Sequence, residues 1–254
     1  MPTWYHAAQL LIRKRFSAGT QFDFNYTFSK SEDWASVVER NGLFAGSVLN
    51  SWNPWLRKDV SDYDVTHNLN FNGIAELPFG KGRKFGSGMP GWANAVIGGW
   101  QLSGIWRWTS GLPTSIGNGF QFPTNWEFTG NATAISAIPG VQTTKGPDGP
   151  NIFKDPAAAF AAFSTTRPGG TGGRNIIRGD GYFSIDTGLS KSWTMPYNEK
   201  HSLQFRWEVF NLTNTARFDV NQSSGNMDNA GTFGRYSGTL TQPRVMQFGL
   251  RYEF

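Results

Sequence analysis

Apolar and polar residues alternate with a period of two along seven segments of the chain. In the clearest segment, 21–29, Phe22, Phe24, Tyr26 and Phe28 fall on one face and polar residues fall on the other. Such alternation predicts a β-strand with one apolar face and one polar face. The other segments with this pattern are 8–16, 68–77, 100–109, 183–190, 203–210 and 245–254. We therefore predict an all-β fold of about seven strands.

Charged residues separate the two faces further. Over the seven segments the apolar face carries one charged residue, Lys14, which stands near a strand end where its long side chain can reach an aqueous interface. The polar face carries ten: Arg13, Arg15, Asp23, Glu76, Arg107, Asp186, Arg206, Glu208, Arg251 and Glu253. We expect Arg206 and Glu208 to pair along the polar wall. Alternation of this kind occurs both in soluble β-sandwiches and in transmembrane barrels.

The lengths of the connections favour one of these two folds. Short or medium connections alternate with long ones: 17–20, 78–99 and 191–202 are the shorter set, and 30–67, 110–182 and 211–244 are the long set. In an up-and-down meander, alternate connections lie at opposite ends of the strands, so all the long ones fall at one end. Outer-membrane barrels have this asymmetry, with short periplasmic turns and long extracellular loops, whereas a sandwich has no reason to follow it. We predict a segment of an antiparallel up-and-down transmembrane β-barrel with long extracellular loops.

The composition excludes several classes of protein. The chain has 254 residues, 21 Phe, 11 Trp, 7 Tyr and no Cys, so disulfide scaffolds and cysteine-ligated metal sites are excluded. No window offers ~18 unbroken apolar residues, which excludes a transmembrane helix. The net charge of +5 comes from scattered basic residues and does not indicate a nucleic-acid partner. The first residues lack the pattern of a signal peptide, so we expect export to depend on a segment outside this chain.

The last residues carry a second signal. Phe248, Leu250, Tyr252 and Phe254 alternate up to a terminal aromatic residue. This pattern resembles the C-terminal strand of bacterial outer-membrane barrels, which the barrel assembly machinery recognises. The resemblance implies that these four residues form an assembly signal. The alternative is an ordinary edge strand that ends on Phe.

Further motifs extend the resemblance over nearly the whole chain. They include Tyr5-His6-Ala7-Ala8-Gln9, Gly99-Trp100-Gln101-Leu102-Ser103-Gly104 and Phe233-Gly234-Arg235. Together they resemble the C-terminal barrel portion of Oar-like TonB-dependent receptors, whose full chains often begin with a carboxypeptidase-regulatory-like domain. That family implies a barrel of about 22 strands, a plug and a segment that contacts TonB. Seven strands do not close a standard barrel, because single-chain bacterial barrels use even numbers. We therefore expect residues 1–254 to be a partial barrel domain of a longer protein.

The resemblance also implies a function in the outer membrane. It implies energised uptake of an extracellular ligand, with lipid, the barrel assembly machinery, TonB and the rest of the barrel and plug as partners. No residues group as a catalytic site, so we expect neither an enzyme nor a cofactor. The alternative is a carbohydrate-binding or adhesion β-protein, either a small barrel or a soluble sandwich, that uses loop tryptophans.

Most of the remaining candidates lie in the long connections. Trp52, Trp55 and Trp126 are candidate ligand contacts, although packing of the loops explains them as well and is the interpretation we favour. Asp59, Asp62 and Asp64 are a candidate calcium site, because Ca²⁺ prefers carboxylate oxygens, but they lack a full EF-hand pattern. His6, His67 and His201 lack the spacing of metal ligands. Residues 156–163 predict a short helix, since Pro156 suits its first position and Asp155 suits its N-cap.

Overall fold

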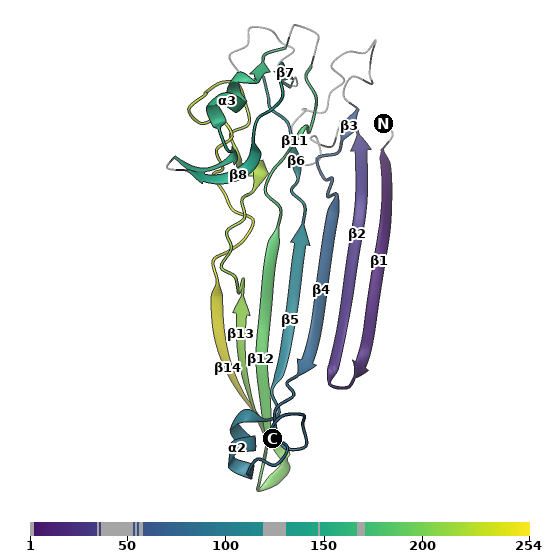
Figure 1. Ribbon diagram of the computed structural model, residues 1–254, viewed down its shortest axis with the longest axis vertical. Coiled ribbons are helices and arrows are strands. Elements are labelled where there is room, and N and C mark those ends of the chain that lie inside the picture. The colour runs from purple at the N-terminus through teal and green to yellow at the C-terminus, as the bar shows by residue number, and fades with distance from the viewer. Residues whose placement is uncertain are drawn as a thin grey trace.

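The computed structural model describes residues 3–34, 36, 53, 55, 58–118, 131–146, 148–166 and 171–254. Seven long strands in this part of the chain form one antiparallel sheet that runs along most of the molecule (Figure 1). Their order in the sheet follows their order in the sequence, which confirms the predicted meander. They are β1 (Trp4–Ser17), β2 (Thr20–Asp33), β4 (His67–Glu76), β5 (Gln101–Thr109), β12 (Phe183–Met195), β13 (Asn198–Phe210) and β14 (Val245–Glu253).

The register keeps apolar residues opposite one another across the sheet. One row runs from Ile12 through Phe24, Phe71 and Trp106 to Ile185, and so joins five strands. A shift of any strand by one residue would move its apolar residues to the polar face of the sheet. The alternation in the sequence therefore also specifies the register in which the strands pair. Each of the seven predicted strands is present, and most are longer than predicted.

The longer strands add charges to the apolar face. Lys30, Glu32 and Lys191 lie beyond the segments counted from the sequence, and their positions in the pairing put them on the same face as Phe28 and Leu189. Lys30 Nζ and Glu32 Oε1 form an ion pair of 2.6 Å. The separation of charge between the faces is therefore strong over the middle of the strands and weaker toward their ends.

The apolar face of this sheet is open. Phe248 is 69% exposed and Leu250 is 70% exposed, and every residue of β14 is exposed. A soluble sandwich would cover such a face with a second sheet about 10 Å away. Within the described ranges the other sheets are two-stranded pairs, which are too small to do so. The part of the chain that the structure describes therefore does not form the alternative fold, a soluble sandwich.

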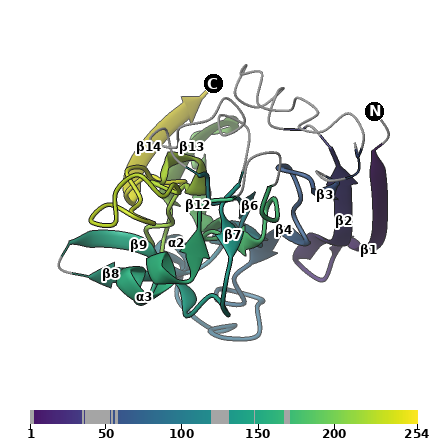
Figure 2. The ribbon, with the colours of Figure 1, turned by 90° about the horizontal axis from the view of Figure 1, so that it is seen from above.

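The three long connections gather at one end of the sheet, here called the loop end, and the shorter ones lie at the opposite, turn end (Figure 1). This confirms the asymmetry expected from the sequence. At the turn end, Ala18 and Gly19 join β1 to β2 with φ angles of 50° and 75°, as a two-residue type I′ hairpin requires. The connection from β4 to β5 carries α2 (Gly91–Ile97), which the sequence analysis did not predict. Seen from above, the long strands follow an arc with β1 and β14 toward its two ends (Figure 2).

Short elements organise the loop end. The predicted helix is present as α3 (Pro156–Ala161), and the side chain of Asp155 accepts a hydrogen bond of 3.0 Å from Ala158 N. It ends before Phe163 because that residue begins β10 and pairs with Ala134. The other elements are β3 (Asp59–Val60), β6 (Pro113–Thr114), β7 (Thr133–Ala134), β8 (Val141–Gly146), β9 (Gly149–Phe153), β10 (Phe163–Ser164), β11 (Ile177–Arg178) and the 3-10 helix η3 (Val220–Gln222).

The main hydrophobic core of the described protein lies in these connections rather than on the sheet. Phe233 is its centre, because its ring stacks on Phe153 at 5.3 Å and meets Phe160 edge-on at 5.2 Å. Ile116, Phe163, Ile177 and other buried side chains from the second and third long connections complete the cluster. The loop end is therefore a folded cap with its own core. No helix of the described residues is long and apolar enough to cross a membrane.

Candidate functional site

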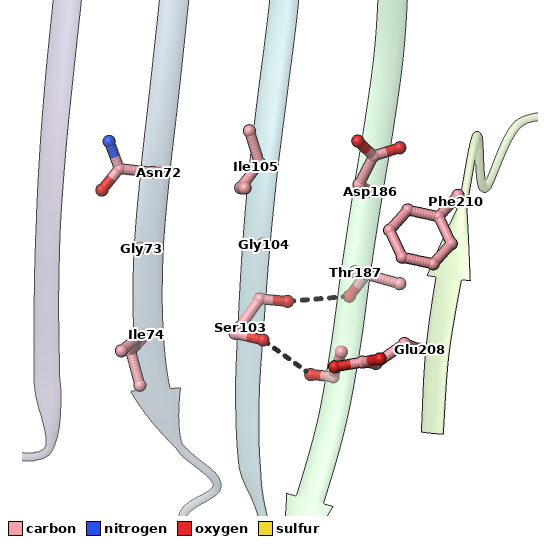
Figure 3. Close-up of a pocket in the computed structure, with 11 residues that line it drawn as sticks. Asn72, Gly73, Ile74, Ser103, Gly104, Ile105, Asp186, Thr187, Glu208 and Phe210 are labelled. Atoms are coloured by element: carbon pink, nitrogen blue, oxygen red, sulfur yellow. Dashed lines mark hydrogen bonds between the residues drawn. The ribbon is translucent and has the colours of Figure 1, made fainter. Parts of the chain in front are cut away.

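A pocket of about 280 Å³ opens on the polar face of the sheet (Figure 3). Strands β4, β5, β12 and β13 build it, and Gly188 of β12 leaves the room for it because it has no side chain. A Cβ atom at Gly188 would lie 2.8 Å from Ser103 Oγ, and that hydroxyl donates a hydrogen bond of 3.3 Å to Gly188 O. The pocket therefore depends on a glycine in the middle of a strand, as is typical where a ligand or another chain approaches the backbone closely.

The lining of the pocket combines carboxylates with apolar side chains. Asp186 pairs with Arg107 at 3.2 Å and also accepts hydrogen bonds from Ser184 Oγ and Asn211 N. Glu208 accepts a hydrogen bond from Gln247 Nε2 and lies 3.9 Å from Arg206, as expected from the sequence. The apolar part of the lining consists of Ile74, Ile105 and Phe210. The arrangement can bind a ligand that has both hydrogen-bond donors and an apolar part.

Sequence reasoning missed the apolar part of this lining. Ile105 and Phe210 occupy polar-face positions and are 47% and 44% exposed. Each is next to an apolar-face residue in the sequence: Phe210 follows Val209, and Ile105 precedes Trp106. Two adjacent apolar residues inside an alternating strand are the signal that identifies such positions, because one of the two must lie on the polar face.

Ion pairs fasten the long connections to one another at the loop end. Arg174, 2% exposed at its side chain, pairs with Asp33 Oδ1 at 2.5 Å and donates to Asp33 O and Asp59 O at 2.7 and 3.2 Å. Arg178 pairs with Asp64. These contacts join the first long connection to the second.

The third long connection is tied in the same way. Arg217 pairs with Asp180 at 3.0 Å, and Phe218 N donates to the same carboxylate at 3.2 Å. Tyr236 OH accepts a hydrogen bond of 3.1 Å from Asp180 N and lies 3.2 Å from Thr143 Oγ1. Burial raises the pKa of Tyr236 above the usual value for a tyrosine, so the hydroxyl keeps its proton. The cap is therefore held by buried polar contacts as well as by its core.

The candidate tryptophans divide into two groups. Trp52 and Trp126 lie outside the described residues. Trp55 is 54% exposed, meets Trp34 edge-on at 4.5 Å and lies 6.2 Å from Trp4, whose ring also faces Lys58 Nζ at 4.2 Å. These contacts make Trp55 part of a cluster of rings at the loop end. Its role as a ligand contact stays a prediction.

The three candidate calcium ligands have protein partners. Asp59 accepts a hydrogen bond of 2.8 Å from Val60 N, and Asp62 accepts one of 2.6 Å from Asn175 Nδ2. Asp64 accepts one of 2.6 Å from Ser31 N besides its pair with Arg178. In the part of the chain that the structure describes, no three His, Cys, Asp or Glu side chains group as a metal site.

The apolar face has aromatic rings toward both ends. Trp100 lies 6.3 Å from Trp193 and 6.0 Å from Phe205 near the turn end, whereas Trp108 lies 6.0 Å from His67 near the loop end. The two levels are about 27 Å apart along a strand at 3.3–3.4 Å per residue, and the height that they span across a membrane is smaller because the strands of such barrels are tilted. Transmembrane barrels have an apolar band about 25 Å tall between two aromatic girdles.

The predicted assembly signal lies on the same apolar face. Phe248, Leu250 and Tyr252 project from β14, and Phe254 is 91% exposed. Tyr252 OH contacts His201 Nδ1 and lies 2.7 Å from Tyr197 OH. Recognition of these residues by an assembly factor stays a prediction.

Comparison with known proteins agrees with this geometry. A family model described as an outer membrane beta barrel domain matches residues 2–247. No curated protein matches the chain. No solved structure matches it either. An open apolar face is typical of the surface that outer-membrane barrels turn to lipid. The chain belongs to the outer membrane beta barrel domain family, whose members lie in the bacterial outer membrane.

Proposed function

We propose that the chain is the C-terminal barrel segment of a TonB-dependent receptor. It supplies part of the barrel wall and ligand-contacting loops for energised uptake. The loop end faces the cell exterior and the turn end faces the periplasm, as in other outer-membrane barrels. The sequence motifs that resemble Oar-like receptors support this assignment.

The observation that carries the proposal is a folded cap above a sheet with two open edges. Within the described residues, β1 pairs only with β2, and β14 pairs only with β13. An open sheet edge in hydrocarbon leaves backbone hydrogen bonds unmade at a high cost. The open edges support the proposal that further strands complete the barrel. A barrel with more strands than the smallest ones has room inside for a plug.

In this function the cap controls access to the lumen, and the polar face of the sheet contacts the ligand. The cap restricts which molecules reach the lumen, because its three connections are locked together by Arg174, Arg178 and Arg217. The pocket around Gly188 offers a first contact on the lumen wall below it. Energy from TonB acts through the plug, so this segment needs no catalytic residue.

A comparison of three strains tests the proposal. The wild type, a strain without this gene and a strain without TonB are grown in a complex medium, and mass spectrometry identifies the compounds that each leaves unused. We expect every compound left by the gene deletion to be left by the TonB deletion as well. A compound that the gene deletion leaves and the TonB deletion still consumes would contradict TonB-dependent uptake.

A further inference from the structure

The connection between β4 and β5 forms a compact projection at the turn end (Figure 1). Three side chains hold its helix α2 in place. Trp193 Nε1 donates a hydrogen bond of 2.6 Å to Ala95 O, Trp100 Nε1 donates one of 2.8 Å to Val96 O, and Lys191 Nζ donates one of 3.1 Å to Asn94 O. Lys191 and Trp193 occupy apolar-face positions of β12, opposite Phe205 and Leu203. The helix α2 is therefore fixed on the lipid-facing side of the sheet.

This projection exposes large apolar side chains. Trp92 is 76% exposed, Val96 63% and Ile97 50%. Trp92 and Val96 are four residues apart and so lie on one face of the helix. Phe79 and Phe85, whose rings are 5.6 Å apart, are 43% and 49% exposed. These five residues, called here the foot, continue the apolar surface of the sheet.

The charge beside the foot has one sign. Residues 77–100 include Lys81, Arg83 and Lys84 and contain no Asp or Glu. Arg83 pairs with Glu76 at 2.7 Å, and Lys84 Nζ lies 5.5 Å from the centre of the Phe85 ring. Lys81 and Lys84 are exposed. Apolar side chains next to lysines are typical of segments that lie in a membrane interface.

We infer that the foot is an anchor in the periplasmic leaflet, with Trp92, Val96 and Ile97 at the acyl boundary and Lys81 and Lys84 on the phosphates of anionic phospholipids. Two observations favour this occupant over a protein partner. The foot is continuous with the apolar face of the sheet, and the charge of the neighbouring Lys81 and Lys84 is opposite to that of the headgroups. The choice of leaflet rests on the proposed orientation.

A fluorescent probe tests the anchor in the full-length protein, reconstituted into vesicles. Trp92→Cys in a background without other Cys is labelled with an environment-sensitive fluorophore and quenched with acrylamide, which is uncharged. Ile135→Cys is the matched control, because Ile135 is 64% exposed at the loop end. In vesicles of phosphatidylcholine with phosphatidylglycerol we expect quenching at position 92 to be about threefold weaker than at position 135. Equal quenching at both positions overturns the anchor.

Charge reversal tests the headgroup contact. We expect Lys81→Glu/Lys84→Glu to remove the additional protection that phosphatidylglycerol gives at position 92. Lys145→Glu/Lys154→Glu changes the net charge equally at the loop end, away from the foot, and is expected to preserve this protection. The contact with Lys81 and Lys84 is overturned if phosphatidylglycerol does not increase protection of the label from acrylamide. It is also overturned if both double variants lose this protection alike.

Failure of the anchor and failure of the proposed function can be distinguished by two further measurements. Heat-modifiable gel mobility of the same samples reports insertion, and the three strains report uptake. A label exposed to water in a protein that inserts and transports overturns the anchor alone. A shielded label in a protein whose uptake does not depend on TonB supports the anchor and overturns the proposed transport role.

Discussion

Arg174 shows how one side chain can fix two long connections. Its buried guanidinium reaches the carboxylate and carbonyl of the buried Asp33 and the carbonyl of the half-buried Asp59. Burying such a group costs free energy unless every charge is compensated. Loss of either partner therefore leaves an uncompensated charge, and the cap loses more than one contact.

We predict that Arg174→Ala destabilises the cap by about 3–5 kcal/mol, as expected when one partner of a buried ion pair is removed. The free energy is measured from the rate of chymotrypsin cleavage within the loops at increasing urea concentration. Arg251→Ala is the control, because its pair with Glu253 is 68% and 51% exposed, and exposed pairs contribute about 0–1 kcal/mol. Equal cleavage of both variants would contradict a stabilising role for Arg174.

A second residue-scale prediction concerns the pocket. Gly188→Val is expected to fill it and to lower uptake of the compounds identified with the three strains, while the folded protein still reaches the membrane. Gly249→Val is the matched control, since Gly249 also lies on the polar face but has open space where its Cβ would be. Uptake by mass spectrometry and heat-modifiable mobility are measured together. Unchanged uptake in Gly188→Val would mean that the pocket is not on the ligand's path.

At the scale of elements, the hairpin between β1 and β2 follows directly from local chemistry. Both turn residues have positive φ, which Gly19 adopts freely and Ala18 adopts at a cost. We predict that Ala18→Asn stabilises the hairpin by about 0.5–1 kcal/mol, because Asn-Gly is the preferred pair for a type I′ turn. The urea midpoint of the refolded protein measures this change. Gly19→Val is expected to lower the midpoint, and the idea fails if both variants shift it in the same direction.

Some helices and strands could be predicted from the sequence and others could not, depending on whether a local pattern marks them. The seven long strands and α3 follow from the sequence, because alternation indicates that the two faces of a strand meet different media, and Pro156 with Asp155 marks a helix start. The short strands of the loop end, such as β8 and β9, were not predicted. Helix α2 did not follow. It is seven residues long, begins with Gly91 and ends before Gly98, and its N-cap Pro90 offers no side-chain cap. Its large apolar residues are exposed instead of packed in a core. Contacts such as Arg174 with Asp33 join residues far apart in the sequence, and no local pattern encodes them.

At the scale of the whole molecule, the chain divides its apolar residues between two solvents. In the proposed orientation, those of the strands meet lipid and need no partner, whereas those of the long connections must find one another because water surrounds the loop end. This explains why the buried cluster around Phe153 and Phe233 lies in the cap, while Leu250 and Phe254 at the other end of the protein are exposed. Mean hydropathy averages over both groups and over the polar face, so a value of -0.42 is compatible with a membrane protein.

The last strand permits a test of assembly that is separate from stability. Phe254 is 91% exposed, so Phe254→Ser removes little packing and is expected to leave the stability of the refolded protein unchanged. If the terminal aromatic residue is read by the assembly machinery, the same variant lowers the amount of heat-modifiable protein in outer-membrane fractions several-fold. Phe16→Ser is the matched control, because Phe16 is an apolar-face residue near the turn end with 53% exposure. Equal losses for the two variants would show that lipid contact, and not recognition of the C-terminus, accounts for the effect.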